Sequence, residues 1–211
     1  MPDWDKRLEE DLKWREAELT SLKHLVGEAE EGIVRHKALL RALWAMLYAH
    51  YEGFCKFALD TYLEVLTELK PRCIDCKDQI VAFSMRGRFR ELSRDLSDAN
   101  CIRFIQGLST IFNQPIEFDF RFKAKSKTQS NLFPDVLCDN CQWVCLPYDQ
   151  VEDNTQRLEA LVSRRNDIAH GENVPVKNIK EYREHEDAAL EVMYALAIAI
   201  IDALEQKRYL K

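Results

Sequence analysis

The chain has 211 residues, of which 46% are hydrophobic and 31% charged, and its formal net charge is −6 at pH 7. This length fits one globular domain, and the negative charge excludes a global basic field for nucleic acid, so RNA binding would need local basic patches. Only six glycines and six prolines are present, which favours helices over the turn-rich strands of a sandwich or barrel.

Three features of the sequence indicate a cytoplasmic protein that does not enter a membrane. The chain opens with Met1-Pro2-Asp3-Trp4-Asp5 and continues as a charged helical pattern, without a signal peptide. The most apolar segment, residues 188–204, contains Glu191 and Asp202 and is too short and too charged for a membrane span. Seven cysteines, an odd number, are typical of reduced thiols.

The N-terminal segment, residues 1–30, predicts one extra helix over residues 3–26. Its apolar stripe alternates steps of four and three residues, and Arg15 occupies the gap, which is a heptad-like pattern. The stripe consists of Leu8, Leu12, Leu19, Leu22 and Val26. Such a stripe either pairs with a second subunit or packs along the chain's own bundle.

Residues 33–70 carry the longest helical pattern, which ends at Lys70 because a residue before proline disfavours the helical conformation. The stripe includes Leu40, Leu43, Trp44, Leu47, Tyr51, Phe54, Ala58, Tyr62, Val65 and Leu66. Gly53 lies inside this helix, where glycine costs about 1 kcal/mol relative to alanine. We therefore expect another helix to approach closely at Gly53.

The middle of the chain is less regular. Residues 75–112 predict two or three short helices, with breaks at Gly87 and at Ser97-Asp98. Residues 113–130 form a partly irregular loop insertion, because a proline ends the helical pattern and lysines then alternate with small polar residues.

Three further helical patterns follow, over residues 131–146, 153–171 and 178–208. Asn178 and Glu181 form a capping box at the start of the last one. The whole chain, residues 1–211, therefore predicts a single all-α domain.

The helix over residues 153–171 carries an arginine where a hydrophobic residue is expected. Its apolar stripe consists of Leu158, Leu161, Val162, Ile168 and Ala169. Arg165 falls on that stripe, His170 ends the helix, and Gly171 suits the left-handed turn that stops it. An arginine on a buried stripe is costly unless a partner pairs with it, so the sequence predicts a partner opposite Arg165.

Arg165 and His170 suit the cleavage of a phosphodiester without a metal. A guanidinium donates bidentate hydrogen bonds to phosphate, and an imidazole transfers protons near neutral pH. Asn166 and His170 share a helix face, whereas Arg165 and His170 point about 140° apart on an ideal helix. Because the helix ends at His170, this side chain can turn back. The alternative is a helix-terminal histidine bonded to the last carbonyls, beside a surface arginine.

Glu52 and Lys56 lie one turn apart in the long helix and border its aromatic stripe. Glu52 is therefore a candidate partner for Arg165 across a helix–helix contact. The alternative is an exposed intrahelical ion pair, which contributes only about a few tenths of a kcal/mol.

The segment Arg165-Asn166-Asp167-Ile168-Ala169-His170-Gly171 resembles the R-x4-H signature of HEPN-domain proteins. Glu52 and Lys56 resemble the E-x3-K motif of many HEPN ribonucleases. The segments Ala49-His50-Tyr51-Glu52-Gly53-Phe54 and Ser130-Asn131-Leu132 are similar to the prokaryotic RiboL-PSP-type branch of HEPN nucleases.

The resemblance covers roughly residues 30–205 and implies an all-helical HEPN bundle. It also implies a homodimer whose two signatures form a composite site, and a metal-independent endoribonuclease of toxin–antitoxin or anti-phage defence type. Such an enzyme leaves a 2′,3′-cyclic phosphate and needs no cofactor.

The resemblance further assigns roles to single residues. Arg165 and His170 would be catalytic, Asn166 would support them, and Glu52 and Lys56 would organise the site. The implied partners are RNA, a second copy of the chain, and a cognate antitoxin or regulatory protein. The alternative is a non-catalytic HEPN module that binds a nucleotide or a protein.

Basic side chains outside this set are candidates for contacts with the RNA backbone. They are Arg164, Arg86, Arg88, Arg90, Lys123 and Lys125. Arg164 also has an allowed spacing from His170, so the sequence leaves open which of the two neighbouring arginines contacts phosphate. For Arg86 to Arg90, the alternative is a solvated face balanced by nearby acidic residues.

Two cysteine pairs, Cys73-x2-Cys76 and Cys138-x2-Cys141, have the local spacing of zinc ligands. The distance between the pairs in sequence is far longer than in zinc ribbons. The second pair also lies within an apolar helical pattern. We therefore interpret these residues as reduced thiols, of which two are packed in the core, and keep zinc as the alternative.

Overall fold

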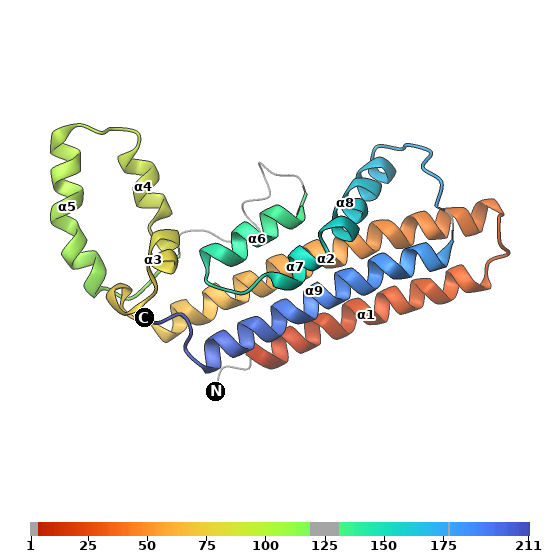
Figure 1. Ribbon diagram of the computed structural model, residues 1–211, viewed down its shortest axis with the longest axis horizontal. Helices are drawn as coiled ribbons and strands as arrows, with labels where there is room; N and C mark the ends of the chain where they lie inside the picture. The colour runs from red at the N-terminus through yellow and green to blue at the C-terminus, as the bar shows by residue number, and fades with distance from the viewer. Residues whose placement is uncertain (1–3, 119–130, 177) are drawn as a thin grey trace.

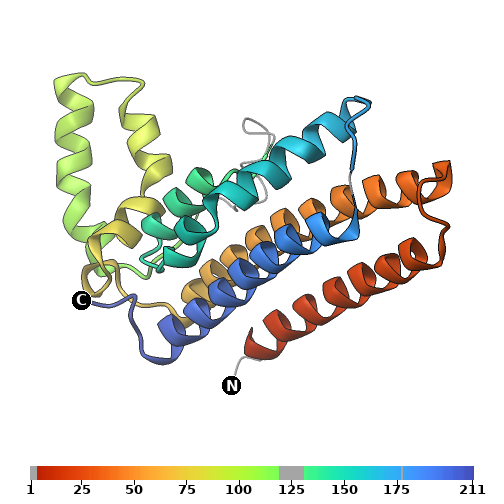
Figure 2. The same ribbon diagram turned by 45° about the vertical axis from the view of Figure 1, so that its right-hand side comes forward.

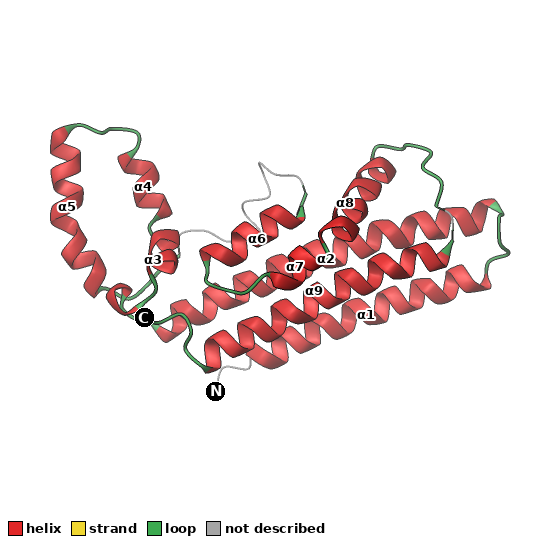
Figure 3. Ribbon diagram, viewed as in Figure 1, coloured by secondary structure: helices red, strands yellow, loops and turns green. Residues whose placement is uncertain are grey.

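The computed structural model describes residues 4–118, 131–176 and 178–211, and its regular elements are helices (Figure 3). They are α1 (Trp4–Glu28), α2 (Val34–Leu69), η1 (Cys73–Asp75, a 3-10 turn), α3 (Asp78–Ser84), α4 (Arg86–Leu92), α5 (Asp98–Asn113), α6 (Pro134–Trp143), α7 (Asp149–Asp153), α8 (Thr155–Ala169) and α9 (Ile179–Glu205). Over these ranges, pairing of extended backbone is limited to isolated bridges. The predicted all-α class is confirmed.

Helix α2 is the central element of the fold. Helices α1, α2 and α9 run side by side, and α8 crosses over α2 (Figure 1). Trp44, Tyr48, Tyr51 and Phe54 of α2 are fully buried, because α2 contacts α1, α8 and α9 around its circumference. Lys70 adopts a left-handed conformation with φ 51°, and its N–H donates to the Leu66 carbonyl, which ends the helix before the following proline.

The apolar stripe of α1 packs against the chain's own bundle. Leu8, Leu12, Leu19 and Val26 are buried, and the principal neighbour of α1 is α2. The structure therefore shows the second of the two arrangements that the heptad-like pattern allowed. Arg15, the exception in the stripe, is also buried, with 8% of its surface exposed.

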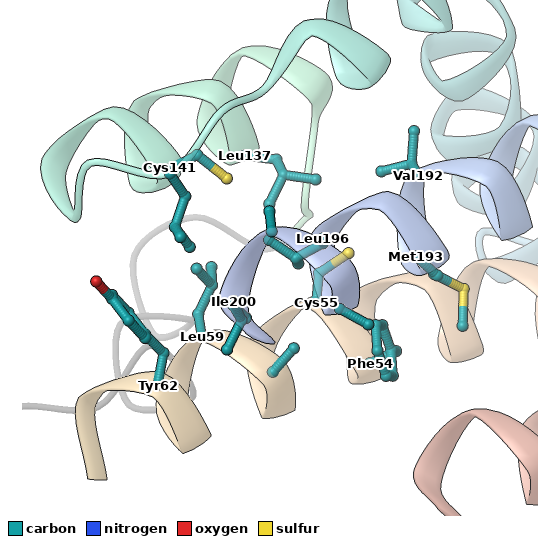
Figure 4. Close-up of a cluster of buried hydrophobic side chains, with 14 of the residues drawn as sticks. Phe54, Cys55, Leu59, Tyr62, Leu137, Cys141, Val192, Met193, Leu196 and Ile200 are labelled. Carbon is teal, nitrogen blue, oxygen red and sulfur yellow. The ribbon is translucent and has the colours of Figure 1, made fainter. Parts of the chain in front are cut away.

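A second part of the core lies where α6 covers α2 and α9 (Figure 4). The side chains from these three helices include Phe54, Cys55, Leu59, Tyr62, Leu137, Cys141, Val192, Met193, Leu196 and Ile200. Burying each large apolar side chain contributes about 1.5–3 kcal/mol. This packing fixes α6, and with it the residues just before α6, against α2.

Helices α4 and α5 form a hairpin that projects from the end of the bundle (Figure 1). Neither helix has a fully buried residue. The predicted break at Gly87 is wrong: the chain breaks at Met85, after the Ser84 hydroxyl donates to the Val81 carbonyl, and Gly87 lies inside α4.

The most apolar stretch of the sequence belongs to α9, whose Ala189, Val192, Met193 and Ile200 are buried in the bundle. Among the helices of the described ranges, none combines the length and the apolar character that a membrane crossing requires.

Candidate active site around Arg165

Two consecutive arginines near the C-terminal end of α8 each stack on an aromatic ring of α2. The guanidinium carbon of Arg164 lies 4.5 Å from the ring centroid of Trp44, and that of Arg165 lies 4.5 Å from the ring of Tyr48. Trp44 and Tyr48 are one helical turn apart, so α2 presents two aromatic rings to α8. Both contacts are within the range of cation–π attraction.

Arg164 is neutralised by a carboxylate. Its Nη1 donates to Glu181 Oε1 at 2.9 Å, and 23% of each side chain is exposed. Glu181 lies in the first turn of α9, where its backbone N–H donates to the Asn178 side chain at 3.0 Å. The Asn178 half of the predicted capping box is therefore confirmed, and the Glu181 carboxylate binds Arg164. Arg164 thus fastens α8 to α9.

Arg165 is held by neutral groups. Its Nη1 donates to the amide oxygens of Asn131 at 2.8 Å and Asn166 at 3.0 Å, and its guanidinium rests on Tyr48. Within the described ranges no carboxylate forms an ion pair with it. The guanidinium is fixed in direction, yet its positive charge is not cancelled, so Arg165 is better suited than Arg164 to an anionic ligand.

The Tyr48 hydroxyl links the residues around Arg165. It accepts a hydrogen bond from the Leu132 backbone N–H at 2.8 Å and lies 3.5 Å from Asn131 Oδ1, to which it can donate. Burial raises the pKa of Tyr48 well above its usual value, and the negative charge of Glu52 acts in the same direction. The phenol therefore keeps its proton at neutral pH.

Glu52 pairs with Lys56, not with Arg165. Lys56 Nζ lies 2.6 Å from Glu52 Oε1, with 18% and 17% of the two side chains exposed. The expected direct contact of Glu52 with Arg165 is thus wrong, because Tyr48, one turn earlier on α2, takes the position facing Arg165. The negative charge of Glu52 nevertheless acts on the Tyr48 hydroxyl and raises its pKa. The pair is too buried to match the exposed alternative.

His170 is exposed at the end of α8. Its backbone N–H donates to the Asn166 carbonyl at 2.9 Å, and Gly171 follows with φ 79°, the left-handed turn that the sequence predicts. Among the residues that the structure describes, none is hydrogen-bonded to the imidazole. Asn166 thus contacts Arg165 through its side chain and His170 through its backbone, which ties the two residues together.

Gly53 admits an arginine from α1. A Cβ atom at this position would lie 2.8 Å from Arg15 Nη1. Arg15 donates to Asp11 at 2.6 Å and approaches His50 Nδ1 at 3.4 Å, and Glu18 lies 2.8 Å from His50 Nε2 without hydrogen-bond alignment. The expected close approach at Gly53 is therefore present, and it braces the face of α2 beside Glu52.

The basic residues of α4 lie far from α8, because the α4–α5 hairpin and α8 stand towards opposite ends of the molecule (Figure 2). Arg86 packs on the rings of Trp143 and Phe83 at 4.4 and 5.4 Å, and burial lowers its pKa. Arg88 and Arg90 are exposed, and Arg88 lines two hollows of about 290 and 350 Å³. The predicted RNA contacts Lys123 and Lys125 fall outside the described residues.

The four cysteines of the zinc alternative do not converge. Cys141 is buried in the core beside Cys55 (Figure 4), whereas Cys73 and Cys76 lie around η1. In the described part of the chain, no three His, Cys, Asp or Glu side chains gather as metal ligands would. Burial raises the pKa of Cys141 to about 12 and that of Cys76 to about 11, which disfavours the thiolates that zinc requires.

Sequence reasoning missed the roles of Asn131 and Tyr48 beside Arg165. Asn131 precedes Arg165 by 34 residues, and no periodicity links them. Tyr48 carried a weak signal, since it lies one turn before Glu52 and one turn after Trp44. The pairing of consecutive arginines with aromatic residues four apart is the pattern that could have identified it.

The family model described as HEPN_MAE_28990-like HEPN matches residues 4–209. The match includes α1, which lies outside the residues 30–205 that the sequence resemblance covers. It does not bear on the finer RiboL-PSP-type assignment, which stays a prediction. No curated protein and no solved structure matches the chain.

Proposed function

The chain belongs to the HEPN family, and from this membership and the surroundings of Arg165 we propose that it is a metal-independent endoribonuclease of toxin–antitoxin or anti-phage defence type. The observation that carries the proposal is the pairing of a fixed, uncompensated Arg165 with an exposed His170 at the end of the same helix. RNA cleavage without a metal needs a positive charge that stabilises the transition state and a group that transfers protons, and these two residues provide them.

In the proposed reaction the ribose 2′-oxygen attacks the adjacent phosphorus while the bond from phosphorus to the 5′-oxygen breaks. Arg165 binds the non-bridging oxygens and stabilises the charge that gathers on them in the transition state. One imidazole removes the 2′-hydroxyl proton, and a proton is delivered to the leaving 5′-oxygen. The products are a 2′,3′-cyclic phosphate and a 5′-hydroxyl.

We place this reaction in a homodimer, in which the two copies of Arg165 and His170 face a shared RNA strand. A second His170 then provides the acid that complements the first as base. Asn166 links the arginine and the histidine of one copy, and Glu52, paired with Lys56, helps to keep the Tyr48 phenol protonated. An antitoxin or regulatory protein would control access to the site.

The test is an RNA cleavage assay with a chelator present, comparing wild type with Arg165→Ala and His170→Ala. We expect each variant to lose about 10²–10⁴-fold in rate. Arg183→Ala and His24→Ala are the matched controls, because both residues are exposed and lie outside the site. Cleavage that survives in both site variants would overturn the proposed site. Absence of cleavage with every RNA class would favour the binding module.

A further inference from the structure

Asn131 accepts a hydrogen bond from Arg165 and comes from outside the helix that carries Arg165. Asn166 follows Arg165 in the same helix, α8, and moves with it. Its hydrogen bond therefore does not fix the arginine relative to the other helices of the bundle. Asn131 comes from the segment before α6, and its Oδ1 accepts from Arg165 Nη1 at 2.8 Å, the shorter of the two bonds. The direction of the guanidinium relative to α2 therefore depends on Asn131 and on the Tyr48 ring.

Asn131 is itself held in place through Tyr48. The neighbouring Leu132 N–H donates to the Tyr48 oxygen at 2.8 Å, and the Tyr48 hydroxyl lies 3.5 Å from Asn131 Oδ1. Tyr48 is fully buried, and α6 is anchored to the core just beyond Leu132. The amide oxygen that receives Arg165 thus lies beside a fully buried phenol, which helps to fix its position.

The chemical identity of this acceptor matters because a carboxylate of the same shape would bind an arginine more strongly. Arg164, the residue before Arg165, shows that alternative, because the Glu181 carboxylate binds it and cancels its charge. At Arg165 the acceptors are two amides, which orient the guanidinium and leave its charge to attract an anion. The selection of amide over carboxylate is what separates the two arginines.

We propose that Asn131 is a positioning residue for Arg165 and that its neutrality is required, so that the arginine is aimed at a phosphate without being neutralised. This inference rests on the proposed function for the identity of the anion. The geometric part, that Asn131 orders the Arg165 side chain, does not depend on RNA cleavage.

The experiment compares Asn131→Asp and Asn131→Ala with wild type in three measurements. These are thermal stability, kcat and KM for RNA cleavage, and the NMR signal of the Arg165 Nε–H group, which Arg165→Ala identifies by its loss. Gln106→Glu on exposed α5 is the control for the added negative charge. A 2′-O-methylated RNA pentanucleotide, which cannot form the cyclic phosphate, serves as the binding probe.

We expect Asn131→Asp to be at least as stable as wild type, with an ordered Arg165 signal, yet to lose about 10²-fold in kcat/KM and to bind the probe more weakly. Asn131→Ala should broaden or shift the Arg165 signal and lower kcat more than it raises KM. Gln106→Glu should change none of these.

Two results would overturn the inference. An unchanged Arg165 signal in Asn131→Ala would remove the positioning role, whether or not the protein cleaves RNA. Wild-type probe binding and cleavage in Asn131→Asp would remove the requirement for neutrality. If wild type cleaves no RNA while Asn131→Ala still disorders Arg165, the positioning role stands and the proposed function fails, so the two failures are distinguishable.

Discussion

Arg15 and Arg165 are both arginines on the apolar stripe of a helix, yet their surroundings differ in charge. Arg15 is buried between α1 and α2, and the Asp11 carboxylate binds it at 2.6 Å. Arg165 is half-buried and bound by the amides of Asn131 and Asn166. The first arrangement is a neutralised clamp and the second a fixed charge. The partner, not the position in the stripe, decides whether such an arginine serves the fold or a ligand.

The largest expected effect separates these two roles. Arg15→Ala leaves Asp11, which is only 14% exposed, without its cation and should cost about 3 kcal/mol of the free energy of unfolding, with little loss of activity per folded molecule. Arg165→Ala should show the reverse, a cost of only about 0.5–1 kcal/mol from the lost stacking on Tyr48, together with lost cleavage. Urea unfolding and the cleavage assay together provide the comparison.

The double variant Asp11→Leu with Arg15→Met is the control for Arg15→Ala. Replacing both members of a buried ion pair by apolar residues is often neutral or stabilising. We therefore expect the double variant to recover most of the lost stability. If the double variant is as unstable as Arg15→Ala, the ion pair of Arg15 with Asp11 is not the cause of the lost stability.

The next effect concerns Arg164, which we assign to the fold despite its place beside Arg165. Arg164→Ala removes the ion pair to Glu181 and the stacking on Trp44, and should cost about 1–2 kcal/mol of unfolding free energy. Arg164→Lys keeps the charge but loses the planar stacking, so its free energy of unfolding should lie between those of wild type and Arg164→Ala. Equal destabilisation by Arg165→Ala would erase the difference between the neighbours.

A smaller effect is expected at Gly53. Alanine favours a helix by about 1 kcal/mol over glycine, but its Cβ would lie 2.8 Å from Arg15 Nη1, which is held by Asp11 and His50. Because overpacking costs about 1–3 kcal/mol, we expect Gly53→Ala to destabilise the protein by about 1 kcal/mol in urea unfolding. In an Arg15→Ala background, Gly53→Ala should instead raise the free energy of unfolding. A lower free energy of unfolding in that background would contradict the steric explanation.

The smallest effect is a pH dependence from the Arg15 cluster. Burial lowers the pKa of His50, Arg15 acts in the same direction, and Glu18 and Asp11 oppose them. The unfolded chain therefore binds a proton at His50 more readily than the folded one, with an unfolded pKa of about 6.5. The contribution of neutral His50 to the free energy of unfolding is therefore complete above that pH. It is lost as the pH falls towards the lower pKa of His50 in the folded state.

Urea unfolding at several pH values from 7.5 down to 5 measures this dependence. In His50→Gln the part of the slope that comes from His50 should disappear. An unchanged slope in that variant would assign the pH dependence to other groups.

Much of the fold follows from periodicity and helix-end chemistry. The stripe of α2, the left-handed Gly171 and the N-cap at Asn178 are local signals that a sequence carries directly. The break near Gly87 was misplaced because a glycine is tolerated within a helix, whereas the turn at Met85 depends on how α3 packs.

The site was predictable only in part. Arg165, Asn166 and His170 belong to one helix, so their spacing is visible in the sequence. The groups that decide the state of the arginines come from α2, α9 and the segment before α6, and their choice depends on tertiary packing. The sequence therefore suggested Glu52 as a partner of Arg165, where packing places Tyr48 and Asn131.

The ion pair of Arg164 with Glu181 closes a ring of chain between residues 17 positions apart, and this ring contains Arg165, Asn166 and His170. The pair acts as a reversible cross-link that removes loop-closure entropy from the turn carrying His170. High salt weakens a partly exposed ion pair before it weakens the apolar core. We therefore expect His170 to sample a wider range of conformations at high ionic strength, while the bundle stays folded.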